Sequence, residues 1–379
     1  MKTIKTYHIH TDYKFLNSIG RFKGGNFDNI NIFVSDDSEL SNSLSSDTLT
    51  FKSSDLDKIV QLCKRADLVV LYDLDALKSK IALALPKKVK IAWRFFGYEL
   101  YSRQRENYIS DRTYKAYLSG EKKLLKKIHS IARRIYCHTY IPGTKIFMFK
   151  RAVSRIDYFL GLSSVEYKLL TKRWKSLPPF IKLSSSPPKF KELSYDMDIK
   201  KEKKIILLGN SKSYYNNHLD IFDMVEETPN KVNYNFKILF NYGLENSYTE
   251  EVRDLCRGKN YYTLIEDFMP ASEFNLFYKK VGALVLNNYR QMAMGNIRYA
   301  FINGVKVYLS KKNIFYHELR KNGFMVFNID QLKEDIYSNN VYLSSHDADN
   351  NFHNLIEVSN NYTNIDLQKM LYKDIELNK

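Results

Sequence analysis

The chain has 379 residues, of which 59 are lysine or arginine and 42 are aspartate or glutamate, so its formal net charge is +17. This length suffices for two domains with separate cores, and the basic balance favours anionic partners such as phosphate ligands, nucleic acid or an acidic membrane surface. Three scattered cysteines without a CxxC pair argue against a disulfide framework or a structural zinc site, and they fit a reducing compartment.

The sequence shows neither the apolar core of a signal peptide nor an apolar run of the roughly 18 residues that a membrane span needs. We therefore expect a cytoplasmic protein that is peripheral at the inner face of the cell membrane.

The first half of the chain alternates strand-like and helix-like segments. Apolar and β-branched runs predict the strands, and helical periodicity lies between them, so we expect a largely parallel sheet covered on both faces. The predicted strands are 5–10, 30–34, 67–72, 89–96, 135–138 and 156–160, and the clearest predicted helices are 56–64 and 121–134.

The composition then shifts to proline, serine and charge, which predicts a linker over 182–203. Beyond it the strand–helix alternation restarts. The predicted strands are 205–208, 236–240, 262–265, 283–286, 305–309 and 324–327, and the predicted helices include 218–226, 247–257 and 272–280.

Two similar halves joined by one linker predict an α/β protein of two Rossmann-like, doubly wound domains that face each other across a cleft. We expect an N-terminal domain over 1–181 and a C-terminal domain over 204–335. A helical tail over 336–379 is expected to pack partly back on the N-terminal domain.

Two strand–turn–helix segments in the second half have the composition of phosphate-binding turns. Gly209-Asn210-Ser211 follows one predicted strand, and Arg290-Gln291 with Gly295-Asn296 follows another. Glycine lets the backbone approach phosphate oxygens, and an arginine adds a two-pronged donor at the carboxyl edge of the sheet. The alternatives are a plain turn for the first segment and a local ion pair for Arg290.

Two further turns reach the same sheet edge. Tyr242-Gly243 follows the strand 236–240, and Phe268-Met269 follows the strand 262–265. Phe268 and Met269 could pack on a nucleobase. Alternatively they form a hydrophobic staple for a helix whose N-cap is Ser272.

Candidate general bases lie at strand ends in the first half. His8 and His10 share one face of the first strand, and Asp12 follows in the loop. Glu99 lies in the aromatic segment 93–101, whose rings could stack on sugars. Asp12 is the preferred base, with His10 and Glu99 behind it, whereas a satisfied structural role is the alternative for His8.

Asp73-Leu74-Asp75 has the D-x-D spacing that holds a divalent metal with a nucleotide diphosphate in some enzymes. The same pattern occurs at 196–198 and 347–349. We interpret all three as caps or surface residues and expect no metal site.

The region 101–135 holds ten lysine or arginine residues against three acids. Within it Leu124, Ile128, Ile131 and Ile135 recur at helical spacing. Such a basic amphipathic helix can lie on an anionic membrane or receive a polyanionic acceptor, and the alternative is a core-packed helix with a solvated basic back. No nucleic-acid motif is present, so we do not expect a nucleic-acid partner.

Taken in order, these segments resemble the TDP-N-acetylfucosamine:lipid II N-acetylfucosaminyltransferase family, also called the 4-α-L-fucosyltransferase family. The resemblance covers mainly 204–328, with scattered agreement in 67–170, where Trp93…Gly97…Glu99…Tyr101 is similar to a tryptophan–glycine–acid–tyrosine segment of the family.

The resemblance implies a metal-independent GT-B glycosyltransferase of hexosyltransferase type, without a cofactor. It would add a deoxyamino or deoxy sugar from a UDP- or TDP-linked donor to a glycan or lipid-linked saccharide in bacterial surface polysaccharide synthesis. The residues expected at the donor are Gly209, Asn210, Ser211, Asn217, His218, Tyr242, Phe268, Met269, Arg290, Gln291, Gly295 and Asn296. A nucleotide-sugar epimerase or hydrolase and a non-catalytic polyanion-binding protein remain alternatives.

Overall fold

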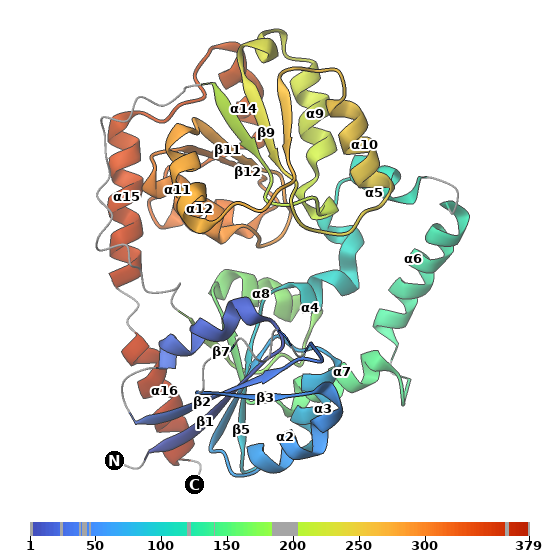
Figure 1. Ribbon diagram of the computed structural model, residues 1–379, viewed down its shortest axis with the longest axis vertical. Helices are drawn as coiled ribbons and strands as arrows, with labels where there is room; N and C mark the ends of the chain where they lie inside the picture. Colours follow the sequence, from blue (N-terminus) through green and yellow to red (C-terminus); the bar gives the residue numbers. More distant parts are fainter. Residues whose placement is uncertain are drawn as a thin grey trace. The chain divides into compact units, whose positions relative to one another are not determined.

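The computed structural model describes residues 3–22, 26–37, 39, 44, 47–119, 123–139, 141–183, 204–360 and 364–377. The chain forms two compact units (Figure 1). The first comprises 1–103, 135–188 and 359–379, and the second comprises 104–134 and 189–358. This division differs from the predicted boundaries, since 104–134 belongs with the second unit.

The described part of the first unit contains a fully parallel sheet in the order β3-β2-β1-β4-β5-β6-β7. Its strands are β1 (Ile4–His10), β2 (Phe27–Val34), β3 (Thr48–Phe51), β4 (Leu68–Tyr72), β5 (Lys90–Arg94), β6 (Tyr158–Gly161) and β7 (Phe180–Lys182). The strand order reverses direction between β1 and β4, which makes their carboxyl ends the switch point of this sheet.

Helices cover this sheet, and one of them comes from the end of the chain. They are α2 (Leu56–Cys63), α3 (Ala76–Ala84), α4 (Tyr98–Tyr101), α7 (Lys145–Arg155), α8 (Ser164–Arg173) and α16 (Asn364–Leu377). Leu371 and Ile375 of α16 are buried in the same cluster as Leu68 and Val70 of β4. The C-terminal helix is therefore part of the first unit's core.

The described part of the second unit contains a second parallel sheet, in the order β10-β9-β8-β11-β12-β13. Its strands are β8 (Ile205–Leu208), β9 (Asn235–Leu239), β10 (Tyr262–Ile265), β11 (Ala283–Leu286), β12 (Lys306–Leu309) and β13 (Phe327–Asn328). Its helices are α5 (Asp111–Leu118), α6 (Lys123–His138, which runs on past the unit's boundary), α9 (His218–Glu226), α10 (Ser247–Cys256), α11 (Ala271–Lys280), α12 (Met294–Ile302), α13 (Ile314–Lys321), α14 (Ile329–Tyr337) and α15 (Ser345–Asn360).

Side-chain alternation along β8 explains why both faces of this sheet carry helices. Ile206 and Leu208 belong to a core cluster shared with α9, α10 and α14, whereas Ile205 and Leu207 belong to one shared with α11, α12 and α13. Successive side chains of a strand point to opposite faces, so a wholly apolar strand needs cover on both. Ala116 of α5 is buried in the first cluster, which places 104–134 with this unit.

The two parallel-sheet, Rossmann-like units confirm the predicted α/β fold class. The predicted strand at 135–138 is wrong, because these residues extend α6 and Ile135 continues its helical spacing. Two short strands, β3 and β7, were not predicted, and β7 includes Lys182 of the predicted linker. Residues 184–203 of that linker lie outside the described residues. None of the described helices is long and apolar enough to cross a membrane.

Candidate functional site

The switch point of the second sheet lies between β8 and β11, which pair with each other in parallel. Gly209 directly follows β8, and its backbone N–H donates to the Val285 carbonyl at 2.9 Å. Arg290 lies in the turn after β11. Ligands of doubly wound sheets bind outside the carboxyl ends of the strands at this point.

Gly209 is the point of closest approach in the turn after β8. Its φ is +66°, and a Cβ built on it would lie 2.2 Å from Nε2 of His218. Only glycine therefore fits, because any other side chain would meet both backbone strain and a buried imidazole.

The His218 imidazole is buried and held in one orientation by Tyr248. The Tyr248 hydroxyl accepts from the His218 backbone N–H at 2.9 Å and lies 2.9 Å from Nδ1. Burial lowers the pKa of His218 to about 3, so the ring is neutral. If the Tyr248 hydroxyl donates a hydrogen bond to Nδ1, then Nδ1 is the acceptor and Nε2 carries the ring hydrogen; Nε2 has no hydrogen-bond partner among the described residues. In this tautomer one neutral N–H donor lies beside the Gly209 backbone.

The loop that follows is fixed by Asn216, which the sequence analysis missed. Its amide nitrogen donates to the carbonyls of Ser211 and Ser213 at 2.9 and 3.1 Å. Its amide oxygen accepts from the Asn210 N–H at 3.2 Å. The Ser211 hydroxyl, also expected at the donor, is buried inside this loop and accepts from the same amide at 3.2 Å. Short polar side chains that bond neighbouring backbone are common in turns, so the serine–asparagine composition was the available signal.

Asn217 is a structural link between three segments. It has a left-handed φ of +48° at the start of α9. Its Oδ1 accepts from the Ser110 N–H at 2.9 Å, and its Nδ2 donates to the Asn287 carbonyl at 2.9 Å. The structure thus places this predicted donor contact where its side chain orients the turn after β11 rather than reaching into a cavity.

A cavity of about 270 Å³ opens at the carboxyl edge of this sheet. It brings together five of the residues expected at the donor: Asn210, Tyr242, Phe268, Met269 and Asn296. Its other walls are Leu239, Asn241, Ile265, Phe274 and Tyr299. Apolar walls with a few amide groups are typical of small-ligand sites. Gly209, Ser211, Asn217, His218, Arg290, Gln291 and Gly295 are not among the lining residues.

The polar groups of the cavity are partly uncommitted. Asn210 Nδ2 donates to the Tyr242 hydroxyl at 3.1 Å. Its Oδ1, and that of Asn241, have no hydrogen-bond partner among the described residues. Phe268 lies at the cavity with 82% of its surface exposed, which suits a face on which a planar ring can stack.

The turn after β11 leads into an uncapped helix. Helix α12 begins at Met294 after Ala293, whose φ is +59°, and it has neither a side-chain cap nor an acidic residue in its first turn. Helices α5, α10, α13 and α14 of this unit are capped by Ser110, Asn246, Asn313 and Asn328, whereas α9 and α11, like α12, have no side-chain cap. Open space surrounds a Cβ built on Gly295, and the N–H groups of this first turn form a site suited to an anion.

Arg290 lies in the segment that leads from β11 into α12. Its Cζ lies 4.5 Å from the centre of the Tyr215 ring, whose residue belongs to the loop after β8. Gln291 is half-buried in the same turn. The aromatic contact orients the guanidinium, a planar group of the kind that binds phosphate oxygens with two parallel hydrogen bonds.

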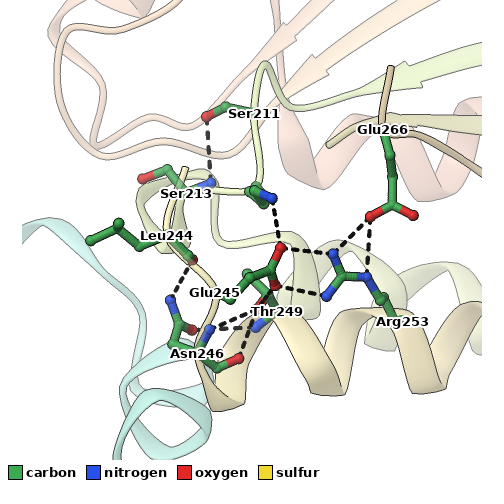
Figure 2. A network of polar contacts seen from close by, with 9 residues as sticks. Ser211, Ser213, Leu244, Glu245, Asn246, Thr249, Arg253 and Glu266 are labelled. Atoms are coloured by element: carbon green, nitrogen blue, oxygen red, sulfur yellow. Dashed lines mark hydrogen bonds and ion pairs between the residues drawn. The ribbon is translucent and has the colours of Figure 1, made fainter. Parts of the chain in front are cut away.

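A polar network ties together the loops around the cavity (Figure 2). Glu245 receives two bonds from Arg253, at 2.8 and 2.9 Å, and one from Lys212 at 2.6 Å. Arg253 also bonds Glu266 at 2.7 Å. Hydrogen bonds from Arg253 and Lys212 hold the pKa of Glu245 well below its usual range. Lys212, Glu245 and Glu266 lie in the loops after β8, β9 and β10. The network therefore connects the loops that carry Tyr242 and Phe268.

The three candidate bases of the first unit have different environments. His10 is buried, its ring stacks on Tyr72 at 4.0 Å, and burial lowers its pKa to about 3. Glu99 is buried, and burial raises its pKa to about 7. Asp12 is half-buried in the loop after β1. Of these three, only Asp12 is accessible to solvent to an appreciable extent.

Glu99 is held by its own segment. Its Oε1 accepts from Trp93 Nε1 at 3.1 Å and from the Phe96 N–H at 3.2 Å, while its Oε2 has no partner among the described residues. Trp93 is fully buried, so it does not offer the sugar-stacking face suggested for 93–101, whereas Tyr98 is 46% exposed. His8 bonds Asn29 at 2.9 Å, in keeping with the structural alternative.

Asp73 and Asp75 of the D-x-D pattern are engaged by a buried lysine. Lys78 Nζ lies 2.7 Å from Asp73, 2.9 Å from Asp75 and 2.7 Å from the Thr11 hydroxyl. Asp75 also caps α3 by accepting from the Lys78 N–H. The ammonium group of Lys78 thus occupies the position that a metal ion bound by Asp73 and Asp75 would take. In the described part of the chain no group of three or more histidine, cysteine or acidic side chains is arranged to hold a metal ion.

Neither a family model nor a curated protein matches the sequence. Solved structures do match over nearly the whole chain. Sucrose-phosphate synthase from Thermosynechococcus elongatus is similar at 10% identity with a TM-score of 0.66, over 99% of this chain and 100% of that one. Anabaena HepE in complex with UDP and glucose is similar at 11% identity with a TM-score of 0.60, over 98% and 99% of the two chains.

An α-glucosyltransferase in complex with UDP and DNA is similar at 11% identity with a TM-score of 0.60, over 98% and 99% of the two chains. At these identities the likeness shows the fold. It confirms the GT-B fold that the resemblance implied, while the glycosyltransferase activity and the fucosaminyltransferase family stay predictions.

Proposed function

We propose that this chain is a glycosyltransferase that moves a sugar from a nucleoside diphosphate donor to a glycan or lipid-linked saccharide. The observation that carries the proposal is the pair of turns at the second switch point: the Gly209 turn, where His218 Nε2 has no partner among the described residues, and the uncapped first turn of α12, which follows Arg290. Both offer N–H donors at one sheet edge, as a diphosphate requires.

The cavity next to these turns suits the nucleoside. Its apolar walls and the exposed Phe268 ring favour a planar base, and the Asn210 and Asn241 amide oxygens suit N–H donors of that base. Uracil and thymine each present one ring N–H between two carbonyls. Either base can give this N–H to one of the amide oxygens. The choice of a UDP- or TDP-linked donor, like the finer proposal of a deoxy or deoxyamino sugar for bacterial surface polysaccharide, follows the resemblance.

In this mechanism the diphosphate leaves as negative charge develops on its oxygens. Arg290 and the α12 N–H groups would stabilise that charge without rearrangement, because the arginine is stacked on Tyr215 and the N–H groups belong to the backbone. A base would take the proton of the acceptor hydroxyl. Asp12 remains the preferred candidate, since His10 holds protons too weakly and the Glu99 oxygens are buried.

A thermal-shift panel of nucleoside diphosphates tests the donor site. At about 100–1,000 times the dissociation constant, a diphosphate that binds only the folded chain stabilises it by about 2.7–4.1 kcal/mol. We expect UDP or TDP to raise the midpoint more than ADP or GDP. No shift with any of the four, together with salt-sensitive binding to anionic polymers, would favour the polyanion-binding alternative.

Acceptor dependence then separates transfer from the other enzymatic alternative. The chain is incubated with UDP- and TDP-sugars with and without a polyprenyl-diphosphate-linked saccharide or free glycan, and nucleoside diphosphate release is measured. A transferase releases it faster with acceptor. Release or sugar isomerisation that ignores the acceptor would instead identify a hydrolase or an epimerase.

A further inference from the structure

Helix α6 exposes its apolar side chains. Leu124, Leu125, Ile128, Ile131 and Ile135, named here the α6 stripe, are each between 51% and 70% exposed. At about 100° per residue they occupy an arc of about 120° on the helix. The core-packed alternative from the sequence analysis is therefore wrong for this helix, since its apolar arc is the solvent-facing one.

The opposite side of α6 is its polar side, and this side is attached to the second unit. Lys126 Nζ donates to the Ser119 carbonyl at 2.9 Å. The Ser130 hydroxyl, 1% exposed, donates to Glu106 at 2.7 Å, and Arg133 bonds the same carboxylate at 3.2 Å. These bonds fix which side faces outward, so the exposure of the stripe does not result from a loosely placed helix.

The charge of α6 indicates what could cover the stripe. The helix carries five lysine or arginine residues and no aspartate or glutamate. Lys127, which is exposed, lies at the margin of the apolar arc, where its stem can follow the apolar surface while its ammonium group reaches outward. A second copy of the helix would bring like charges together, whereas an anionic lipid surface offers both an apolar layer and opposite charge.

We propose that the α6 stripe docks the chain on an anionic membrane, with the helix lying in the plane of the interface. The apolar side chains would enter the boundary between headgroups and acyl chains, and the Lys127 ammonium group at the margin of the stripe would remain at the phosphates. The proposal is independent of the proposed glycosyl transfer, because it concerns only which surface the helix contacts.

Vesicle co-sedimentation of the full chain tests this surface. We expect binding to phosphatidylcholine vesicles that contain phosphatidylserine, little binding to phosphatidylcholine alone, and weakening with added salt. Ile128→Ser/Ile131→Ser should reduce the partition coefficient at least about tenfold, because it removes two branched side chains that would be buried in the bilayer. The matched control, Val232→Ser/Leu276→Ser, replaces aliphatic residues elsewhere on the unit that are 66% and 60% exposed, and it should bind as the unchanged chain does.

Several outcomes would overturn the proposal. These are equal binding to both vesicle types, no binding to either, or an equal loss in the two double variants. Gel filtration without lipid adds a separate check: a dimer that Ile128→Ser/Ile131→Ser dissociates would assign the stripe to a second copy. Unchanged far-UV circular dichroism shows that the variants fold. If they do not fold, the proposal is tested by the unchanged chain alone, from its binding to vesicles with and without phosphatidylserine.

Discussion

Replacing Gly209 by alanine tests the geometry of the turn after β8 independently of any ligand. Two effects add. The φ of +66° costs a non-glycine residue about 1–2 kcal/mol. The new Cβ would also stand 2.2 Å from His218 Nε2, and moving that buried ring breaks its bond to Tyr248, which costs about 1–3 kcal/mol more. We expect Gly209→Ala to destabilise the second unit by about 2–5 kcal/mol.

Two other glycines separate these effects. Gly258 has a φ of +73° with nothing within 4 Å of a Cβ, so Gly258→Ala should cost only the backbone contribution of about 1–2 kcal/mol. Gly295 lies in α12 with open space around it, so Gly295→Ala should be neutral or stabilise by up to about 1 kcal/mol through helix propensity.

Urea unfolding followed by two probes measures the difference. Both tryptophans, Trp93 and Trp174, lie in the first unit, so their fluorescence reports on that unit while far-UV circular dichroism reports on both. Gly209→Ala should shift the dichroism transition and leave the fluorescence transition in place. In a His218→Ala background the added cost of Gly209→Ala should fall to that of Gly258→Ala. Equal costs for Gly209→Ala and Gly258→Ala would refute the contact with His218.

Three further predictions concern charged groups. Arg290→Ala should weaken nucleoside diphosphate binding at least about tenfold by calorimetry, because a charge-assisted hydrogen bond worth about 1.5–3 kcal/mol is lost. The control Arg257→Ala removes an arginine of an exposed surface ion pair and should bind normally. Equal affinity of the two variants would argue against the donor site. Lys78→Ala should destabilise the first unit by about 3–5 kcal/mol, since it leaves Asp73 and Asp75 without their buried cation. Lys58 is exposed, so Lys58→Ala serves as the control, and its free energy of unfolding should not change. As pH falls below about 6.5, His8 and His10, with pKa values lowered to about 4 and 3, should destabilise the first unit, because the unfolded state binds more protons. Glu99, whose pKa is raised to about 7, opposes this effect between about pH 4.5 and pH 7, because the folded state binds its proton more tightly than the unfolded state. Glu99→Gln should therefore steepen the fall of fluorescence-detected stability with falling pH by about 1.4 kcal/mol per pH unit. Identical slopes for the variant and the unchanged chain would contradict the burial of Glu99 as a carboxylic acid.

Much of the fold was predictable from local pattern. Apolar runs such as Ile205–Leu208 predict buried parallel strands because both faces of such strands need apolar cover. Eleven of the twelve predicted strand segments overlap a strand of the structure. The failures were local as well. Residues 135–138 have a β-branched start but continue a helix, and β3 and β7 are edge strands whose short sequences carry little periodic signal.

The candidate site was predictable in part for the same reason. Strand direction places Asn210, Tyr242, Phe268, Met269 and Asn296 at one sheet edge, and the structure gathers these five around one cavity. The spacing of residues along the chain says nothing of which partner fills a side chain's hydrogen bonds. Asn217 therefore could not be identified as a structural link, nor Asn216 as the organiser of the loop, because their partners are set by the folded turn.

The sequence by itself determined the alternation of strands and helices, the two halves and the polar turns at strand ends, because these follow from side-chain periodicity and turn chemistry along neighbouring residues. Only the tertiary structure decided three other features: that 104–134 packs with the second unit, that Tyr248 orients His218 beside Gly209, and that α6 turns its polar side inward. Each depends on contacts between residues far apart in the chain. An amphipathic pattern defines two sides of a helix, but only its neighbours determine which side is buried.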